Sequence, residues 1–296
     1  NNMWMEALQK EMIQFGVAIE IQGQGIRAPP GWSKVTGHLV WNVKMDFTRK
    51  ARWVLDGHKT PDPICSQYAG VVSRESVRIA FTYAALNGLD VCVADIWNAY
   101  LQAPSSRKDY FVCGPEFGLE NEGKVALIHR AVYGGKSAGR DFRSHLRSCM
   151  IHLGFESCPA DPDVWMRPAT KADGLEVYEY VLVYSDDLIM IGVHPDETAA
   201  QISQHFKFKG NLAEKPEQYL GANVGLMTVQ GVSCWYMSSD EYCKAAVENI
   251  ETWMKKRNQM LPTRTACVFP SKWKPELDVT PELKDEDANY YQQQIG

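Results

Sequence analysis

The stretch Val181-Leu182-Val183-Tyr184-Ser185-Asp186-Asp187-Leu188-Ile189-Met190-Ile191 places two adjacent acids between two wholly apolar runs. Apolar runs of this length, rich in branched side chains, are typical of strands buried on both faces, and the polar insert predicts a hairpin turn. Asp186 and Asp187 are therefore expected at the edge of a buried sheet. Ionised carboxylates are costly there unless a cation compensates them, and a divalent metal ion is the most economical one. The alternative at this point is an ordinary turn, in which aspartate is common.

Length and composition indicate a globular protein. The 296 residues, 45% of them hydrophobic, are enough for one large domain or two ordinary ones. None of the eight cysteines lies in the closely spaced pairs that are typical of zinc sites. Without a signal peptide at the start, reduced thiols in an intracellular protein are expected. No apolar stretch approaches the roughly 18 residues of a membrane span, so no membrane partner is expected.

The net charge of -5 argues at first against a nucleic-acid partner. The distribution of charge changes this interpretation, because residues 276–287 carry six acids and one base and leave the remainder neutral. Within that remainder, residues 44–59 hold five bases against two acids, and residues 124–147 hold six bases against Asp141 alone. Local patches of this kind, rather than the net charge, decide whether phosphate groups bind.

A third acid, Asp95, ends the predicted strand 90–95. The exposed end of a buried strand is where open sheets tend to place reactive groups, whereas a capping aspartate is the alternative. Three acids in two elements are what two-metal phosphoryl transfer requires. We expect Asp95 and Asp186 to bridge two ions and the carbonyl of Ile96 to complete their coordination. Asp187 is expected to be the weaker ligand, because adjacent side chains of a strand point in opposite directions.

The helix predicted from Lys136 to Leu153 has one basic and one apolar face. Four bases recur at intervals of four, three and four residues and lie within roughly 60° of one another. These bases are Lys136, Arg140, Arg143 and Arg147. The apolar face carries Phe142, Leu146, Cys149 and Leu153. A purely basic row predicts contact with phosphate groups, and a solvated helix face is the alternative.

Other periodic segments complete the expected elements. These are a helix over 4–12, a hairpin over 38–53, a helix over 73–86, strands over 110–113, 125–128 and 163–166, a helix over 195–206, a hairpin over 219–237 and a helix over 239–256. Four prolines after Lys256 favour extended, loosely packed chain. This tail is expected to be poorly ordered by itself.

The order of these motifs resembles that of the reverse transcriptase domain of copia-type long-terminal-repeat retrotransposons. The likeness begins at Trp4-x-x-Ala7-x-x-x-Glu11 and reaches the last residue. The motifs are, in order, Lys50-Ala51-Arg52-Trp53-Val54, Ala94-Asp95-Ile96-Trp97-Asn98-Ala99-Tyr100-Leu101, Val132-Tyr133-Gly134-Gly135-Lys136-Ser137-Ala138-Gly139-Arg140, Gly154-Phe155 with Asp161, Tyr184-Ser185-Asp186-Asp187, Phe206-Lys207-Phe208-Lys209-Gly210 and Tyr219-Leu220-Gly221. Each motif alone is weak, whereas seven in sequence are specific.

The resemblance implies an α+β right-hand polymerase with fingers, a palm and a partial thumb. The palm is expected to be an antiparallel sheet packed on helices. The implied boundaries are 1–88 and 105–140 for the fingers, 89–104 and 141–230 for the palm, and 231–296 for the end of the palm and a truncated thumb or connection fragment.

The resemblance also implies an RNA-directed DNA polymerase that uses two Mg²⁺ or Mn²⁺ ions, with Asp95, Asp186 and Asp187 as its catalytic residues and, with Ile96, its metal ligands. The implied nucleotide-binding residues are Lys50, Arg52, Tyr100, Tyr133, Gly134 and Lys209. The implied template and primer contacts are Lys136, Arg140, Arg143, Arg147, Tyr184, Ser185, Leu220 and Gly221.

The implied partners are an RNA or DNA template with its primer, deoxynucleoside triphosphates, and the RNase H and integrase regions of a parent polyprotein. The expected location is a cytoplasmic virus-like particle, with a DNA product destined for the nucleus. A decayed copy that binds nucleic acid without polymerising is the main alternative, because Gly135, Ser137 and Gly139 differ from the residues common in the family. An unrelated metal phosphohydrolase is a second alternative.

Overall fold

The computed structural model describes residues 2–43, 48–62, 67–220, 222–261, 274, 277, 279 and 281–295. The chain divides into two compact units. The first unit comprises residues 1–216 and 231–234, and the second comprises residues 217–230 and 235–296.

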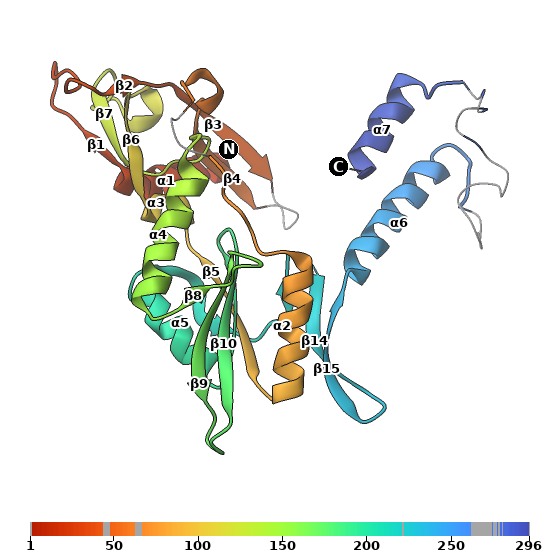
Figure 1. Cartoon of the computed structure of the whole chain (residues 1–296). Helices are drawn as coiled ribbons and strands as arrows, with labels where there is room; N and C mark the ends of the chain where they lie inside the picture. The colour runs from red at the N-terminus through yellow and green to blue at the C-terminus, as the bar shows by residue number, and fades with distance from the viewer. Residues whose placement is uncertain are drawn as a thin grey trace. The chain divides into compact units, whose positions relative to one another are not determined.

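A six-stranded antiparallel sheet is the centre of the first unit (Figure 1). Its strands, in spatial order, are β12 (Phe208–Glu214), β5 (Asp90–Ile96), β11 (Asp187–Gly192), β10 (Glu176–Tyr184), β9 (Val164–Thr170) and β8 (Glu156–Ser157). The predicted central hairpin is β10–β11, in which Leu182 lies opposite Ile189. All seven residues of its two apolar runs are at most 4% exposed. The prediction of strands buried on both faces is therefore confirmed.

Helices cover both faces of this sheet (Figure 1). One face carries α2 (Arg74–Asn87), and the other carries α4 (Ala138–His152) and α5 (Pro195–Ser203). The predicted ends of α2 are confirmed, because the Ser73 hydroxyl accepts the N–H of Ser76 and Gly88 adopts a left-handed φ of 58°. Tyr83 of α2 packs edge-on against Tyr180 of β10, with ring centroids 5.2 Å apart.

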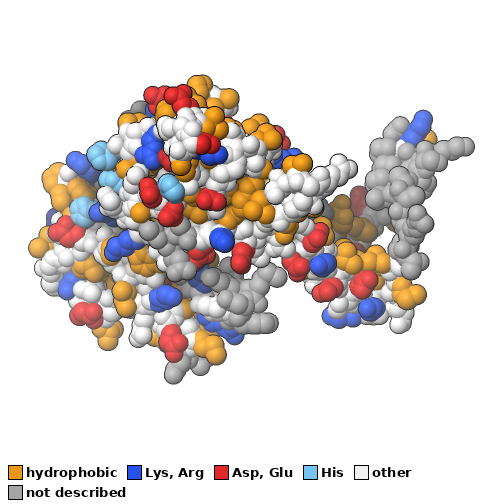
Figure 2. Space-filling view, turned by 90° about the horizontal axis from the view of Figure 1, so that it is seen from below, with side chains coloured by type: hydrophobic (Ala, Val, Ile, Leu, Met, Phe, Trp, Pro, Cys, Tyr) orange, Lys and Arg blue, Asp and Glu red, His pale blue; other side chains and the backbone are white. Residues whose placement is uncertain are grey.

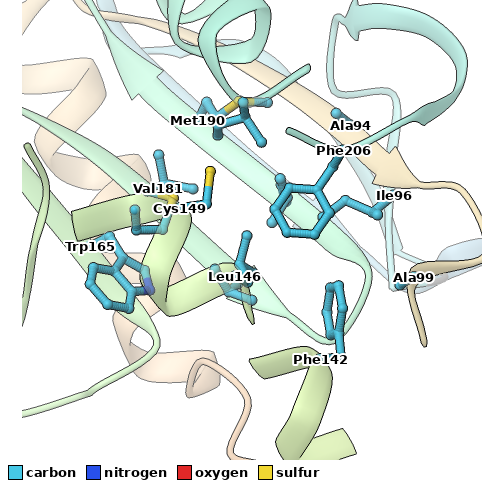
Figure 3. Close-up of a cluster of buried hydrophobic side chains, with 14 of the residues drawn as sticks. Ala94, Ile96, Ala99, Phe142, Leu146, Cys149, Trp165, Val181, Met190 and Phe206 are labelled. Carbon is cyan, nitrogen blue, oxygen red and sulfur yellow. The ribbon is translucent and has the colours of Figure 1, made fainter. Parts of the chain in front are cut away.

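The buried cluster under α4 and α5, here called the sheet core, joins these helices to alternating residues of the sheet (Figure 3). Phe142, Leu146 and Cys149 form the apolar face predicted for α4, and they pack with Val181 and Met190. Side chains of a strand alternate between its two faces, so the neighbours of Val181 and Met190 point away from this core.

A second buried cluster, here called the aromatic core, lies among the remaining elements of the first unit. It is enclosed by α1 (Asn2–Phe15), by the hairpin β3 (Gly37–Val43) and β4 (Arg49–Leu55), and by a sheet of β1 (Ile19–Ile21), β7 (Val125–Arg130), β6 (Pro104–Val112) and β2 (Ser33–Lys34). Trp53 is its centre, with ring centroids 4.7 Å from Phe15 and 4.5 Å from Phe111. The short helix α3 (Ala99–Gln102) contributes residues to both cores.

In its described residues, the second unit contains two helices and most of a three-stranded sheet, of which residues 232–234 are assigned to the first unit. These elements are β13 (Gln218–Tyr219), β14 (Ala222–Val229), β15 (Val232–Ser238), α6 (Asp240–Lys255) and α7 (Asp285–Ile295). The hairpin and α6 are as predicted, but α7 contradicts the expectation of extended chain throughout the tail. The prolines all precede α7, and three acids in its first turn favour a helix through the helix dipole. The rings of Trp253 and Tyr290 stack at 4.6 Å and join α7 to α6.

Membrane-spanning character is absent from the described helices: none of them is both long enough and apolar enough to cross a bilayer.

Candidate active site

Three neighbouring strands place two acids and a lysine side by side. Asp95 of β5 lies opposite Asp187 of β11 on one side and opposite Lys209 of β12 on the other. Residues directly opposite one another project from the same face of a sheet. Their neighbours Ala94 and Leu188 belong to the sheet core, so Asp95 and Asp187 project from the face that α4 and α5 do not cover.

Ser185 and Asp186 form the turn between β10 and β11. The N–H of Ile96 donates to the carbonyl oxygen of Asp186 at 2.8 Å, which holds this turn at the end of β5 beside Asp95. Ser185 adopts a left-handed φ of 56°. Because a β-branched side chain is strained in that region, serine is a suitable residue at this position.

Lys209 partly compensates the charge of the acids. Its Nζ lies 2.6 Å from Oδ2 of Asp95, and this hydrogen bond raises the pKa of the lysine. Burial, followed by the charges of Asp186 and Asp95, raises the pKa of the Asp187 carboxyl to about 6. The raised pKa of Asp187 means that negative charge remains in excess among the three acids.

The acids fit a hard divalent cation in their chemistry. Carboxylate and carbonyl oxygens are the donors that Mg²⁺ and Mn²⁺ prefer, and the excess negative charge favours a cation. Across the described part of the chain, no three His, Cys, Asp or Glu side chains are arranged closely enough to surround one ion. Lys209 occupies an oxygen of Asp95 instead. A metal ion that binds Oδ2 of Asp95 would therefore displace Lys209.

A cleft of about 400 Å³ opens beside these acids. The charged residues of its lining are the bases Lys10, Arg49, Lys50, Arg52 and Lys209 and the acids Glu11, Asp95 and Asp186. Bases thus outnumber acids by two, and they come from α1, β4 and β12. Of the residues predicted from the sequence, the structure brings Lys50, Arg52, Tyr133 and Lys209 into one cleft with Asp95 and Asp186.

Arg52 is held by an aromatic pair rather than by an acid. Its guanidinium lies 4.5 Å from the centroid of the Tyr133 ring. The Tyr133 ring in turn packs on Tyr100, at 5.1 Å between centroids, and Tyr100 packs on the sheet core. Burial raises the pKa of the Tyr133 hydroxyl, so this group stays protonated at neutral pH. The stack connects the predicted triphosphate-binding arginine to the residue predicted to lie beneath the sugar.

Gly134 lies against the backbone of β4. The Leu55 N–H donates to the carbonyl of Tyr133 at 2.8 Å, which joins this loop to the end of the strand. Gly134 has a φ of 80°, and a Cβ there would overlap the carbonyl oxygen of Leu55. A Cβ on Gly57 would likewise overlap the carbonyl oxygen of Gly134. The structure therefore gives Gly134 a packing role that the sequence did not predict.

The predicted basic row is present but largely neutralised, and its first base, Lys136, precedes α4, which begins at Ala138 rather than at Lys136. Lys136, Arg140 and Arg143 form ion pairs with Asp62, Asp141 and Asp163, at 2.7, 2.8 and 2.8 Å respectively. Arg147 lies over the ring of Trp165, 5.8 Å from its centroid. The face drawn in Figure 2 likewise intersperses Lys and Arg with Asp and Glu. The positive row seen in the sequence is thus balanced by acids, two of which are distant in sequence.

Four further residues were predicted to contact the template or the primer. Tyr184, at the end of β10, is 36% exposed, and Ser185 lines a separate cavity of about 150 Å³ with Tyr100. Leu220 adopts a left-handed φ of 49° in the second unit. Gly221 lies outside the described residues.

The sequence did not predict that α1 contributes to the cleft. Ala7, Lys10, Glu11 and Gln14 of this helix are part of the lining. Their spacing of three, four and seven residues is visible in the sequence as one helix face. Nothing in the sequence indicated what that face contacts.

Comparison with known proteins identifies the family. Residues 26–263 match the family described as Reverse transcriptase (RNA-dependent DNA polymerase). The chain belongs to the reverse transcriptase family. The match includes every charged residue of the cleft lining except Lys10 and Glu11, because α1 precedes the matched residues. The resemblance seen in the motifs is therefore confirmed.

Two related proteins are retrotransposon polyproteins of Arabidopsis thaliana. The retrovirus-related Pol polyprotein from transposon RE1 is 26% identical over 178 residues, which are 58% of this chain and 12% of that polyprotein. The corresponding protein from transposon RE2 is 26% identical over 166 residues, 54% of this chain and 11% of its own length. This reverse transcriptase domain thus spans a small part of the length of these relatives.

Proposed function

We propose that this reverse transcriptase domain is an RNA-directed DNA polymerase that adds deoxynucleotides to the 3′ end of a primer on an RNA or DNA template. The observation that carries the proposal is the single cleft that Asp95 and Asp186 share with Lys50 and Arg52. Paired acids are suited to hold divalent ions, and paired cations are suited to bind a triphosphate. Their combination in one cleft fits phosphoryl transfer from a nucleotide.

Two Mg²⁺ or Mn²⁺ ions would be held by Asp95, Asp186 and Asp187, with the carbonyl of Ile96 as a further ligand. Such ions, when bound, lower the pKa of an attacking hydroxyl and neutralise a leaving pyrophosphate. Asp95 and Asp186 both line the cleft, which supports them as the principal ligands, whereas Asp187 is not part of its lining.

The side chains of the cleft bind and orient the nucleotide. Lys50 and Arg52 bind its triphosphate, and the Tyr133 ring holds the guanidinium of Arg52 in position. Tyr100 packs beneath the deoxyribose and excludes a 2′-hydroxyl by its bulk. Lys209 turns from Asp95 towards the phosphates when the site is loaded.

Template and primer contacts are assigned to the residues that the family resemblance implies. Tyr184 and Ser185 contact the primer end from the β10–β11 turn, and Leu220 and Gly221 are further primer contacts. Template phosphates are contacted by Lys136, Arg140, Arg143 and Arg147. These contacts use N–H groups that do not already bind the neighbouring acids. In this proposal the fingers are residues 1–88 and 105–140, the palm is residues 89–104 and 141–230, and residues 231–296 end the palm and begin the thumb or connection.

The two Arabidopsis relatives are named as retrovirus-related Pol polyproteins of transposons. We infer that this domain works within the polyprotein of a copia-type retrotransposon, together with RNase H and integrase regions. Its reaction would take place in a cytoplasmic virus-like particle, and its DNA product would enter the nucleus.

Primer extension on an RNA template with Mg²⁺ tests the proposal. The wild type is expected to extend the primer, and Asp186→Asn is expected to slow extension by about 100-fold or more, because it removes a charge on which the transition state depends. Asp173→Asn makes the same change in an exposed turn and serves as the matched control. Failure of the wild type to extend any primer would favour the inactive remnant, and phosphate hydrolysis without a primer would favour a phosphohydrolase.

A further inference from the structure

The cleft contains a cation to which the proposed function assigns no role. Lys10 lies on α1, before the residues that match the reverse transcriptase family, and lines the cleft with Lys50 and Arg52. We propose that Lys10 is a further phosphate-binding cation for the incoming nucleotide and that Glu11 positions it. This inference rests on the proposed function, since it takes the cleft to be the nucleotide site.

Buried contacts fix α1 to the strand that carries Lys50 and Arg52. Oε1 of Glu11 accepts the backbone N–H of Trp53 at 2.9 Å, and Glu11 is only 8% exposed. One turn later, Phe15 of α1 packs on the Trp53 ring in the aromatic core. A carboxylate is rarely buried without a hydrogen-bonding partner, because burial costs free energy. Burial also raises the pKa of Glu11. Glu11 therefore sets where α1 lies along β4.

A second contact fixes α1 to the loop that follows Asp95. The side-chain oxygen of Gln14 accepts a hydrogen bond from the amide of Asn98 at 3.0 Å. Asn98 begins α3 with a left-handed φ of 46°, three residues after Asp95. The helix is thus attached both to the cationic strand and to the acidic end of β5. Because Lys10 is on the same face as Gln14, it is presented to the space between them.

The charge environment of Lys10 indicates an anionic ligand. The side chain of Lys10 has neither a hydrogen bond nor an ion pair with any residue that the structure describes, and the guanidinium of Arg52 lies over the Tyr133 ring. The bases at and just before α4 differ in this respect, since Arg143 and Lys136 are paired with acids. A cation without a protein partner in the wall of a cleft that already carries excess positive charge favours a polyanion. The triphosphate of a nucleotide is such a ligand.

The test compares two variants that change the net charge equally on neighbouring residues of α1. Lys10→Gln removes a charge from the cleft, and Gln9→Glu adds an acid at an exposed position that is not part of the lining. In primer extension at saturating template and primer, Lys10→Gln is expected to raise KM for the nucleotide about 5- to 20-fold, with a smaller change in kcat. Gln9→Glu is expected to stay within about twofold of the wild type.

Two further readouts separate phosphate binding from a structural role. Lys10→Arg should restore KM, because it keeps the charge, and Lys10→Gln should weaken inhibition by a deoxynucleoside triphosphate more than by the monophosphate. Equal KM values for Lys10→Gln and Gln9→Glu, in an enzyme that extends primers, would overturn the inference and leave the proposed function intact.

If no variant extends a primer, the affinity of the protein for a nucleotide tests the inference instead. Quenching of tryptophan fluorescence by dATP, reported by Trp97 in the cleft, would then be compared between the wild type and Lys10→Gln. Weaker binding by the variant would support Lys10 although the polymerase proposal had failed. Absence of binding by the wild type, or equal binding by both proteins, would overturn the inference as well.

Discussion

At the scale of single residues, Lys209 is the most informative side chain of the site. Its ammonium group lies 2.6 Å from Asp95, in a row that continues to Asp187 across the sheet. A tethered cation here reduces the repulsion among the acids in the absence of a metal ion. The same cation must compete with any divalent ion that binds to Asp95.

Replacing Lys209 by Met is therefore expected to strengthen Mn²⁺ binding, by about 3- to 10-fold, because the competing charge is removed. Calorimetric titration of the EDTA-treated protein measures this affinity. Lys207→Met is the matched control, since Lys207 is exposed two residues away and uses its backbone rather than its side chain to contact Gln102. An unchanged or weaker affinity of Lys209→Met would show that the lysine does not compete with the ion.

Asp56 is a second residue whose role follows from its surroundings. This carboxylate is buried and lies within hydrogen-bonding distance of Thr36, His38 and Lys59. The hydrogen bonds from Lys59 and Thr36 are the main reason that the pKa of Asp56 falls far below its usual value. The acid is thus accommodated by partners that would repel a lysine.

A depressed pKa in the folded state stabilises the protein above the pKa of the unfolded chain, which is about 3.9 for aspartate. Asp56→Asn is therefore expected to lower the urea midpoint at pH 7. Its deficit relative to the wild type should shrink as the pH falls from about 4, because the wild type then loses the same contribution. Glu122→Gln, an exposed acid, serves as the control. A deficit that stays constant down to pH 2 would argue against the charge of Asp56.

At the scale of elements, α4 shows which half of an amphipathic pattern can be interpreted from sequence. Its apolar face was predicted correctly, because burial depends on a period that the helix itself sets. Its basic face was predicted to contact phosphates, but Arg143 forms two hydrogen bonds to Asp163, at 2.8 and 3.1 Å. Asp163 is 20 residues away, and no local pattern indicates such a partner.

Arg143→Gln is expected to lower the free energy of unfolding by about 2 kcal/mol, or the melting temperature by about 5 °C. The reason is that Asp163, 4% exposed, would remain buried without its partner. Arg147→Gln is the control, because Arg147 packs on the Trp165 ring, and it is expected to cost less than about 1 kcal/mol. Asp163→Asn should recover part of the loss when combined with Arg143→Gln. Equal melting temperatures of the two single variants would leave phosphate contact as the main role of Arg143.

Strand β12 is an element that the sequence pattern did not predict. Lys207 and Lys209 were interpreted as the end of the preceding helix, whereas Phe208–Glu214 is a strand that pairs with β5. A short strand with few branched residues carries little local signal, and its partner lies more than 100 residues earlier. The family motif indicated that Lys209 is functional, but only the pairing places it beside Asp95.

At the scale of the whole molecule, local patterns predicted most elements, and distant pairing decided the site. The central hairpin, α1, α2, α4 and α6 each follow from a clear period or cap in the sequence. The cleft instead combines segments near residues 10, 50, 95, 133, 186 and 209. The motif order indicated most of these segments. The contribution of α1 to the cleft was not predicted, because no spacing along the chain indicates that this helix contacts β4.

The helix α3 joins the two cores, and this has a consequence for synthesis of the protein. Ala99 and Ala103 belong to the sheet core, and Leu101 between them belongs to the aromatic core. The aromatic core extends from Phe15 to Val132, and the sheet core from Cys92 to Phe206. At translation rates of about 5 to 20 residues per second, about 4 to 15 seconds separate the emergence of Val132 from that of Phe206. The aromatic core can therefore assemble before the sheet core is complete, and α3 then links a formed core to one whose later residues are still being synthesised.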